Sequence, residues 1–159
     1  MIVGNKKSFA IEFTQSESDP KMGYGKVWIQ NEFYGTNKDL IYLDSYLISL
    51  INELINELIN AKKIDFEFEK LSESELFELF ENELNRFDYL IKGSTFTDDF
   101  TAYRFNKNGT IFLIWKMWNN KEILFSDLKD YGTKIKFCKV KKVEIENIKD
   151  KLLKKATQI

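Results

Sequence analysis

The sequence predicts an α+β fold, namely an antiparallel sheet of hairpins with two or three helices packed on it. Three features favour this class: short segments of alternating apolar residues, segments whose apolar residues recur at a helical period, and an Asn-Gly pair between two apolar segments. The chain of 159 residues has the usual length of one domain, and no long linker divides it. We therefore expect a single domain over residues 1–159.

Strands are expected first. Residues 8–14 (SFAIEFT) alternate large apolar residues with smaller or polar ones, which is the period of a half-buried strand. Residues 15–25 are rich in Ser, Asp, Pro and Gly and indicate a loop, in which residues 23–25 (GYG) are expected to form a turn. Residues 26–34 (KVWIQNEFY) again suit a pleated strand.

Two amphipathic helices are expected next. The first is capped by Asp44 or Ser45, and its apolar face comprises Leu47, Leu50, Ile51, Leu54, Ile55 and Leu58. Residues 64–68 alternate, which indicates a short strand or an extended link, and residues 72–75 (SESE) match a capping box. The second helix then carries an apolar stripe of Leu76, Phe77, Phe80, Leu84 and Phe87.

The last third of the chain predicts a hairpin, a strand and a final helix. Residues 100–105 and 110–118 flank Asn108-Gly109, a pair that tolerates positive φ and is typical of tight hairpin turns. A single helical turn is expected to begin at Ser126-Asp127. Residues 134–143 then predict a strand with one solvated lysine face, and residues 144–155 predict a helix whose stripe comprises Ile145, Ile148, Leu152 and Leu153.

The composition argues against an enzyme. The sequence contains no histidine, which excludes Ser-His-Asp and Cys-His arrangements and removes the commonest metal ligand. With Cys138 as the single cysteine, a structural zinc site is also excluded. The glycines form neither a phosphate loop nor a dinucleotide fingerprint, so we expect no cofactor. Asp98 and Asp99 are interpreted as loop carboxylates without a catalytic role, and Cys138 as a structural residue.

The same features indicate a cytoplasmic protein. A lone cysteine cannot form an internal disulfide, which fits a reducing compartment. The N-terminus lacks the apolar stretch of a secretory signal, and no run of about 18 apolar residues predicts a membrane span.

Charge is distributed unevenly, although the net charge is only −1. Residues 66–99 contain 10 acidic residues and three basic ones, whereas residues 131–159 contain nine lysines and three acidic residues. The lysine-rich end leaves open a small regulatory or nucleic-acid-binding module, although the pI of about 5.7 and the lack of an aromatic RNA-binding signature make nucleic acid a poor fit.

The acidic segment suggests a protein partner. An ordinary solvated helix face explains the carboxylates equally, but a negative surface would also attract a basic partner and reject others. The hypothesis for a partner-binding surface comprises Glu73, Glu75, Glu78, Glu81, Asp98 and Asp99.

Two blocks of the sequence carry a resemblance. Residues 1–13 (MIVGNKKSFAIEF) resemble the start of bacterial immunity proteins encoded at polymorphic-toxin and contact-dependent growth inhibition loci. Members often begin with an apolar pair, Gly with Asn or Asp, and then Phe-Ala-Ile. A second similar block runs over residues 27–35 (VWIQNEFYG) and is followed by residues 39–43 (DLIYL), so the resemblance covers about the first third of the chain.

The resemblance implies a function in binding and blocking a cognate toxin domain, with a nuclease as one candidate for the toxin. It carries over no catalytic residues. Which toxin is bound, and whether its active site is covered directly, stay open at this point.

Overall fold

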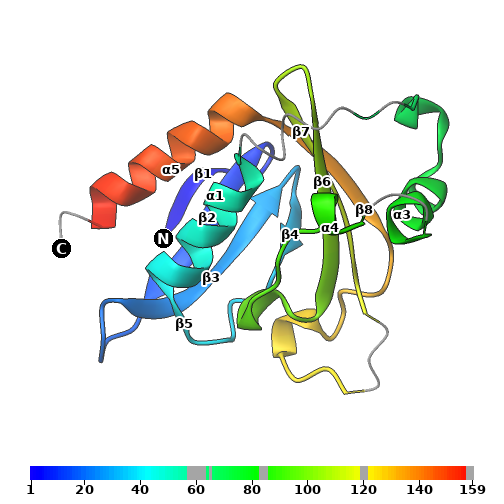
Figure 1. Cartoon of the computed structure of the whole chain (residues 1–159). Coiled ribbons are helices and arrows are strands. Elements are labelled where there is room, and N and C mark those ends of the chain that lie inside the picture. The colour runs from blue at the N-terminus through cyan, green and yellow to red at the C-terminus, as the bar shows by residue number, and fades with distance from the viewer. Residues whose placement is uncertain (57–63, 65, 83–85, 119–121, 157–159) are drawn as a thin grey trace.

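Two antiparallel sheets form the framework of the computed structural model, which describes residues 1–56, 64, 66–82, 86–118 and 122–156 (Figure 1). The first sheet has the order β1-β2-β3-β4, with β5 also paired to β3; its strands are β1 (Ile2–Asn5), β2 (Phe9–Gln15), β3 (Met22–Ile29), β4 (Glu32–Tyr34) and β5 (Ile41–Tyr42). The second sheet has the order β6-β7-β8; its strands are β6 (Phe100–Lys107), β7 (Thr110–Met117) and β8 (Lys136–Lys141).

Helices connect and cover these sheets, which confirms the expected α+β class. A π-helix, η1 (Leu43–Ile48), runs directly into α1 (Ser49–Leu54). The other helices are η2 (Phe68–Lys70), α3 (Glu73–Asn82), α4 (Arg86–Tyr89), η3 (Thr95–Thr97), η4 (Ser126–Leu128) and α5 (Lys142–Ala156). In Figure 1, α1 and α5 lie over the first sheet, and α3 lies on the far side of the second sheet.

The second sheet is covered on both faces. Its residues Ala102, Leu113 and Val140 belong to a core shared with the first sheet, α1 and α5. Residues of opposite parity, including Tyr103 and Phe105, form an aromatic cluster with α3, because side chains alternate between the two faces of a strand. This second cluster, called here the aromatic cluster, comprises Phe68, Leu76, Phe77, Phe80, Tyr103, Phe105 and Ile114, with Phe112 and Phe137 packed against it.

The interpretation of residues 134–143 as a strand with one solvated lysine face is confirmed only in part. The strand is β8. Lys139 and Lys141 are exposed on one face, but Phe137 on that same face packs against the aromatic cluster, and Cys138 on the other face is buried in the shared core. The lysine alternation misled because Lys136 is itself half-buried, with its Nζ 3.1 Å from a carboxylate oxygen of Glu32.

Polar side chains join the two sheets. The Lys26 Nζ lies 3.3 Å from Asp127 Oδ2, and the two side chains are only 8% and 12% exposed. Asp127 also accepts hydrogen bonds from the Thr36 hydroxyl at 2.6 Å and from the Asn37 backbone N–H at 3.1 Å. These bonds hold η4, which precedes β8, against β3 and the loop after β4.

Several sequence predictions are confirmed. β2 matches residues 8–14, and the 100–118 hairpin turns at Asn108 and Gly109, whose φ values are 53° and 76°. Ser126 starts the single turn η4, and α5 buries Ile145, Ile148 and Leu152. Leu153, which was expected in the same stripe, is instead 39% exposed. The helix expected from Leu47 exists as η1 and α1, but the Asp44 and Ser45 side chains form no cap; its expected end at Leu58 lies outside the described residues.

Other predictions were wrong. Residues 23–25 are not a turn but part of β3. Glycine is needed at position 23 for the close approach of the adjacent strand, because a Cβ there would lie 2.3 Å from the Thr14 carbonyl oxygen. The turn is instead at Gln30 and Asn31, which both have positive φ and divide the expected strand 26–34 into β3 and β4. β1 and β5 were not predicted, since each is short.

The second helix also ends earlier than its apolar stripe suggested. α3 buries Leu76, Phe77 and Phe80, but Phe87 lies on α4 and is 78% exposed; Leu84 lies outside the described residues. Of residues 64–68, those that the structure describes form no strand, and Phe68 begins η2.

Candidate functional site

The acidic helix α3 is anchored at its start by the expected capping box. The Glu75 backbone N–H donates to the Ser72 hydroxyl at 3.2 Å, and the Ser72 N–H donates to the Glu75 carboxylate at 2.7 Å. The Ser72 backbone N–H, followed by its hydroxyl, holds the pKa of Glu75 below its ordinary value. Phe77 and Phe80 then fix the buried side of the helix on the aromatic cluster.

The predicted acidic residues on α3 differ in role. Glu73, Glu75 and Glu78 are exposed. Glu81 is half-buried and accepts a hydrogen bond from the Tyr103 hydroxyl at 2.5 Å. Glu75 and Glu81 therefore support the structure of the protein itself, whereas Glu73 and Glu78 belong to the exposed side of α3.

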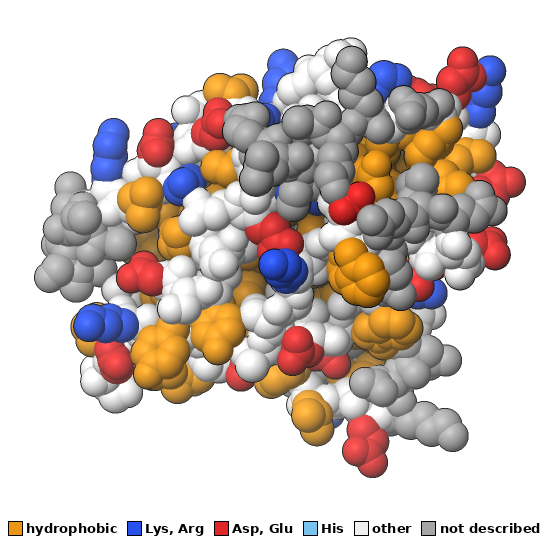
Figure 2. All heavy atoms as spheres, viewed as in Figure 1, with side chains coloured by type: hydrophobic (Ala, Val, Ile, Leu, Met, Phe, Trp, Pro, Cys, Tyr) orange, Lys and Arg blue, Asp and Glu red, His pale blue; other side chains and the backbone are white. Residues whose placement is uncertain are grey.

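A groove of about 330 Å³ lies beside α3 and is called here the acidic groove. It combines carboxylates with aromatic and basic side chains: Lys116 Nζ lies 4.9 Å from the centre of the Phe77 ring, and Trp118 is 46% exposed. In Figure 2, acidic side chains lie over α3 at the right edge of the molecule, with hydrophobic side chains beside them. The groove is lined by Ser74, Phe77, Glu78, Glu81, Asn82, Lys116, Trp118 and Ile135.

The groove brings together only some of the predicted residues. Glu78 and Glu81 line it, whereas Glu73 and Glu75, which flank the lining residue Ser74, are not among its lining residues. Asp98 is exposed after η3, and Asp99 is half-buried. Neither lines the groove, but the backbone of Asp99 is next to it, because the Trp118 N–H donates to the Asp99 carbonyl oxygen at 2.8 Å. Burial, followed by the charge of Asp98, raises the pKa of Asp99.

Sequence reasoning missed Trp118 and Lys116. They belong to the segment 110–118, which alternation marked as a hairpin strand. A tryptophan at the end of an expected strand, next to a polar turn, is a weak signal of exposure, and only the tertiary structure shows that Trp118 lines the same groove as α3.

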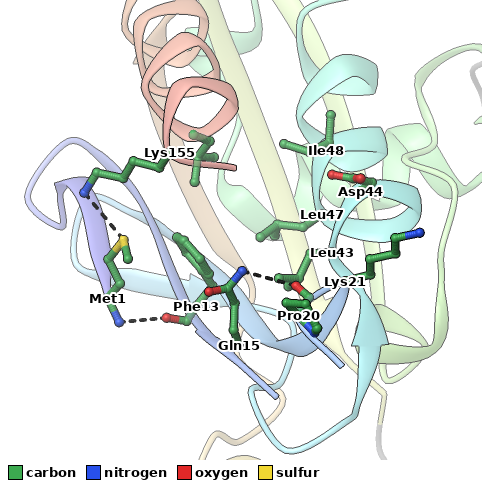
Figure 3. A pocket seen from close by; sticks show the side chains of 11 residues that line it. Met1, Phe13, Gln15, Pro20, Lys21, Leu43, Asp44, Leu47, Ile48 and Lys155 are labelled. Carbon is green, nitrogen blue, oxygen red and sulfur yellow. Dashed lines mark hydrogen bonds between the residues drawn. The ribbon is translucent and has the colours of Figure 1, made fainter. Parts of the chain in front are cut away.

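A second concave region, called here the apolar pocket, has a volume of about 650 Å³ (Figure 3). It lies at the opposite side of the molecule from α3 (Figure 1). It opens between the last turns of α5, the π-helix η1 and strand β2. Its lining residues are Met1, Phe13, Gln15, Pro20, Lys21, Leu43, Asp44, Leu47, Ile48, Leu152 and Lys155.

The described residues offer little for catalysis. Among them, no group of three or more Cys, Asp or Glu side chains is arranged to hold a metal ion. The Cys138 thiol is buried, and burial raises its pKa to about 12, so it is not poised to act as a thiolate. In the same part of the chain, every helix is too short or too polar to cross a bilayer.

The lysine-rich end is not one continuous basic face. Lys136 pairs with Glu32 and lies 5.5 Å from the centre of the Tyr131 ring. Lys142 Nζ lies 3.6 Å from a carboxylate oxygen of Glu146, one helical turn away. Ion pairs of this kind reduce the charge available for a phosphate backbone.

Comparisons with known proteins identify a similar structure and a matching family. In structure it is similar to the CdiI protein from Burkholderia dolosa AUO158, with a TM-score of 0.62 and 18% sequence identity over 98% of this chain and 99% of that one. At this identity the likeness shows a shared fold. A search of curated protein sequences gave no match. The model of the family described as Immunity protein 42 matches residues 1–155, which is nearly the whole length, and the chain therefore belongs to the Immunity protein 42 family.

Proposed function

We propose that this immunity protein binds a cognate bacterial toxin domain in the cytoplasm and neutralises it without catalysing a reaction. The family membership and the CdiI-like fold support this function. The lack of histidine and the buried, protonated thiol of Cys138 support a non-catalytic inhibitor. A core that contains residues of both sheets supports a chain that acts as one domain.

The binding surface in this proposal is the acidic groove with the exposed side of α3. The observation that carries it is the position of Trp118, a half-exposed tryptophan beside Glu78 and Glu81. Buried aromatic anchors next to charged residues dominate many protein interfaces, and tryptophan is enriched among them. The rigid packing of α3 on the aromatic cluster keeps these side chains in a fixed arrangement before the partner arrives.

The charge of this surface selects a basic partner. Glu73 and Glu78 are exposed, and the groove adds Glu81. A nuclease toxin fits this description, because a nuclease must present basic residues to the phosphates of its substrate. Asp98 and Asp99 belong to the periphery of the proposed surface, since neither lines the groove and Asp99 is joined to Trp118 by a backbone hydrogen bond.

Association kinetics with the purified toxin domain test this surface. Glu73→Lys combined with Glu78→Lys should slow association about tenfold at low salt, because long-range attraction to a basic partner is reversed. Trp118→Ala should act mainly on dissociation and weaken binding by about 2 kcal/mol. Glu75 and Glu81 are left unchanged because each holds a hydrogen bond within the protein.

The matched control is Glu17→Lys combined with Asp150→Lys. Both residues are exposed and distant in sequence from α3, and the change in net charge is the same. Equal slowing by the test pair and the control pair would mean that only net charge matters, and the acidic groove would no longer be supported as the contact surface.

A further inference from the structure

The apolar pocket is a second concave site, separate from the acidic groove. Its volume of about 650 Å³ falls within the range of roughly 300–1,000 Å³ that is usual for small-molecule sites. By comparison, the acidic groove has about half this volume, 330 Å³. The pocket can therefore accommodate more than the tip of one side chain.

The interior of this pocket is apolar. Phe13 and Leu47 are buried, and Leu43 and Ile48 are half-buried. Figure 3 shows these side chains, which come from β2 and η1, around the space below α5. Apolar surface left open in this way gains free energy when an apolar ligand removes it from water.

The π-helix η1 shapes one wall. Four lining residues, Leu43, Asp44, Leu47 and Ile48, belong to this single element. π-helical turns are rare in proteins and are frequent at functional sites. The π-helix η1 therefore lines the apolar pocket, which is larger than the acidic groove.

Charge at the mouth is asymmetric. On the α5 side, the Lys155 ammonium donates to the Met1 thioether sulfur at 3.5 Å, which is a weak acceptor (Figure 3). On the η1 side, Asp44 lies in the first turn, where the helix N–H groups favour a negative charge. Lys21 adds a second positive charge to the lining. A carboxylate would be a stronger partner for Lys155 than the sulfur is.

We propose that the apolar pocket binds an amphipathic carboxylate, with its apolar chain between η1, β2 and α5 and its carboxylate on Lys155. The site does not depend on the toxin, and it lies on a different surface from the proposed toxin contact. An apolar interior with one charged group at the mouth orients such a molecule, because the chain and the head group have different environments.

Decanoate is a suitable probe, and its binding can be measured by methyl NMR of the full-length protein. The expected result is saturable shifts in the methyl signals of Met1, Leu43, Leu47, Ile48 and Leu152. The methyl signals of Leu76 and Ile114 in the aromatic cluster should not shift. Decanol, which has the same chain without the charge, should bind about tenfold more weakly than decanoate.

Two variants test separately the contribution of the charge and that of the apolar interior. Lys155→Glu, at an exposed position, should weaken decanoate binding about tenfold or more and leave decanol binding unchanged. Leu43→Trp should fill the pocket and abolish binding of both molecules; its methyl spectrum shows whether the fold is kept. Lys151→Glu makes the same charge change one turn earlier on α5, at an exposed residue that does not line the pocket, and this variant should bind decanoate as the wild type does.

Three outcomes would overturn the proposal. Shifts that do not saturate, or that appear equally in the aromatic cluster, would indicate non-specific association. Equal affinity for decanoate and decanol, with no effect of Lys155→Glu, would show that the pocket does not recognise a carboxylate. If the pocket methyl signals shift with the toxin domain but not with decanoate, the pocket binds a part of the toxin instead of a small carboxylate.

Discussion

The acidic groove and the apolar pocket differ in what lies beneath them. Beneath the groove, Phe80 stacks on Tyr103 with ring centres 5.3 Å apart, and Phe105 stacks on Phe112 at 5.0 Å. The space under α3 is therefore filled, and the charges of the helix sit on a rigid base. At the pocket, α5 and η1 diverge and leave about 650 Å³ open. The difference suggests that one surface is built to meet a large partner and the other to admit a small one.

The largest expected effect is on the filled side. Phe80→Ala should lower the free energy of unfolding by about 3–5 kcal/mol, because Phe80 is fully buried and the surrounding rings cannot close the cavity. Ile48→Ala, at the half-buried wall of the pocket, should cost only about 1 kcal/mol. Denaturant unfolding of both variants measures the contrast, and similar losses would show that the two regions do not differ in packing.

A somewhat smaller effect is expected between the two sheets. Asp127→Asn should cost about 3 kcal/mol at neutral pH, because it leaves Lys26 as a buried cation without its carboxylate partner. Burial raises the pKa of Asp127, but the hydrogen bonds from Thr36, Asn37 and Lys26 outweigh it, and the pKa lies below its ordinary value.

The sign of the pH dependence follows from this lowered pKa. The stabilisation by Asp127 is complete above the ordinary carboxyl pKa and is lost as the pH falls through the lower pKa of the folded state. The difference in unfolding free energy between wild type and Asp127→Asn should therefore shrink below about pH 4. Urea unfolding over a series of pH values measures it, with the exposed Asp150→Asn as control. A difference independent of pH would mean that the charge of Asp127 contributes nothing.

The smallest effect concerns the start of α3. Ser72→Ala should cost about 1 kcal/mol, because the Glu75 backbone N–H loses its acceptor. Glu75→Gln should cost less, since an amide oxygen can still accept from the Ser72 N–H. Thermal unfolding of the two variants compares them. If Glu75→Gln proved the more costly, the charge of Glu75 rather than its hydrogen bond would hold the helix.

Local patterns predicted the elements that local chemistry determines. The capping box at residues 72–75 and the turn at Asn108-Gly109 depend on a few neighbouring residues, and both are present as predicted. β1 was missed because it is held by pairing with β2 rather than by a pattern of its own. The partial burial of the lysine face of β8 was missed because only tertiary structure brings Phe68 and Phe112 against Phe137.

Only part of the candidate site could be predicted from the sequence. Counting carboxylates identified α3, but it could not separate Glu78 from Glu81, whose carboxylate is held by Tyr103 from a strand 22 residues away. Trp118, which directly follows β7, lines the groove with α3 only because the chain folds to bring these distant segments together. The apolar pocket combines residues from Met1 to Lys155, a separation that no local pattern contains.

The central claim, toxin neutralisation, is tested most directly by bacterial growth. The toxin domain encoded beside this gene is expressed alone, with the wild-type protein, with Glu73→Lys/Glu78→Lys/Trp118→Ala, and with the control pair Glu17→Lys/Asp150→Lys. The account predicts that the wild type and the control restore growth and co-purify with the toxin, and that the triple variant does neither while remaining folded. Continued growth arrest in the presence of the wild-type protein would contradict the proposed function. Full protection by the triple variant would contradict the acidic groove as the surface that carries it.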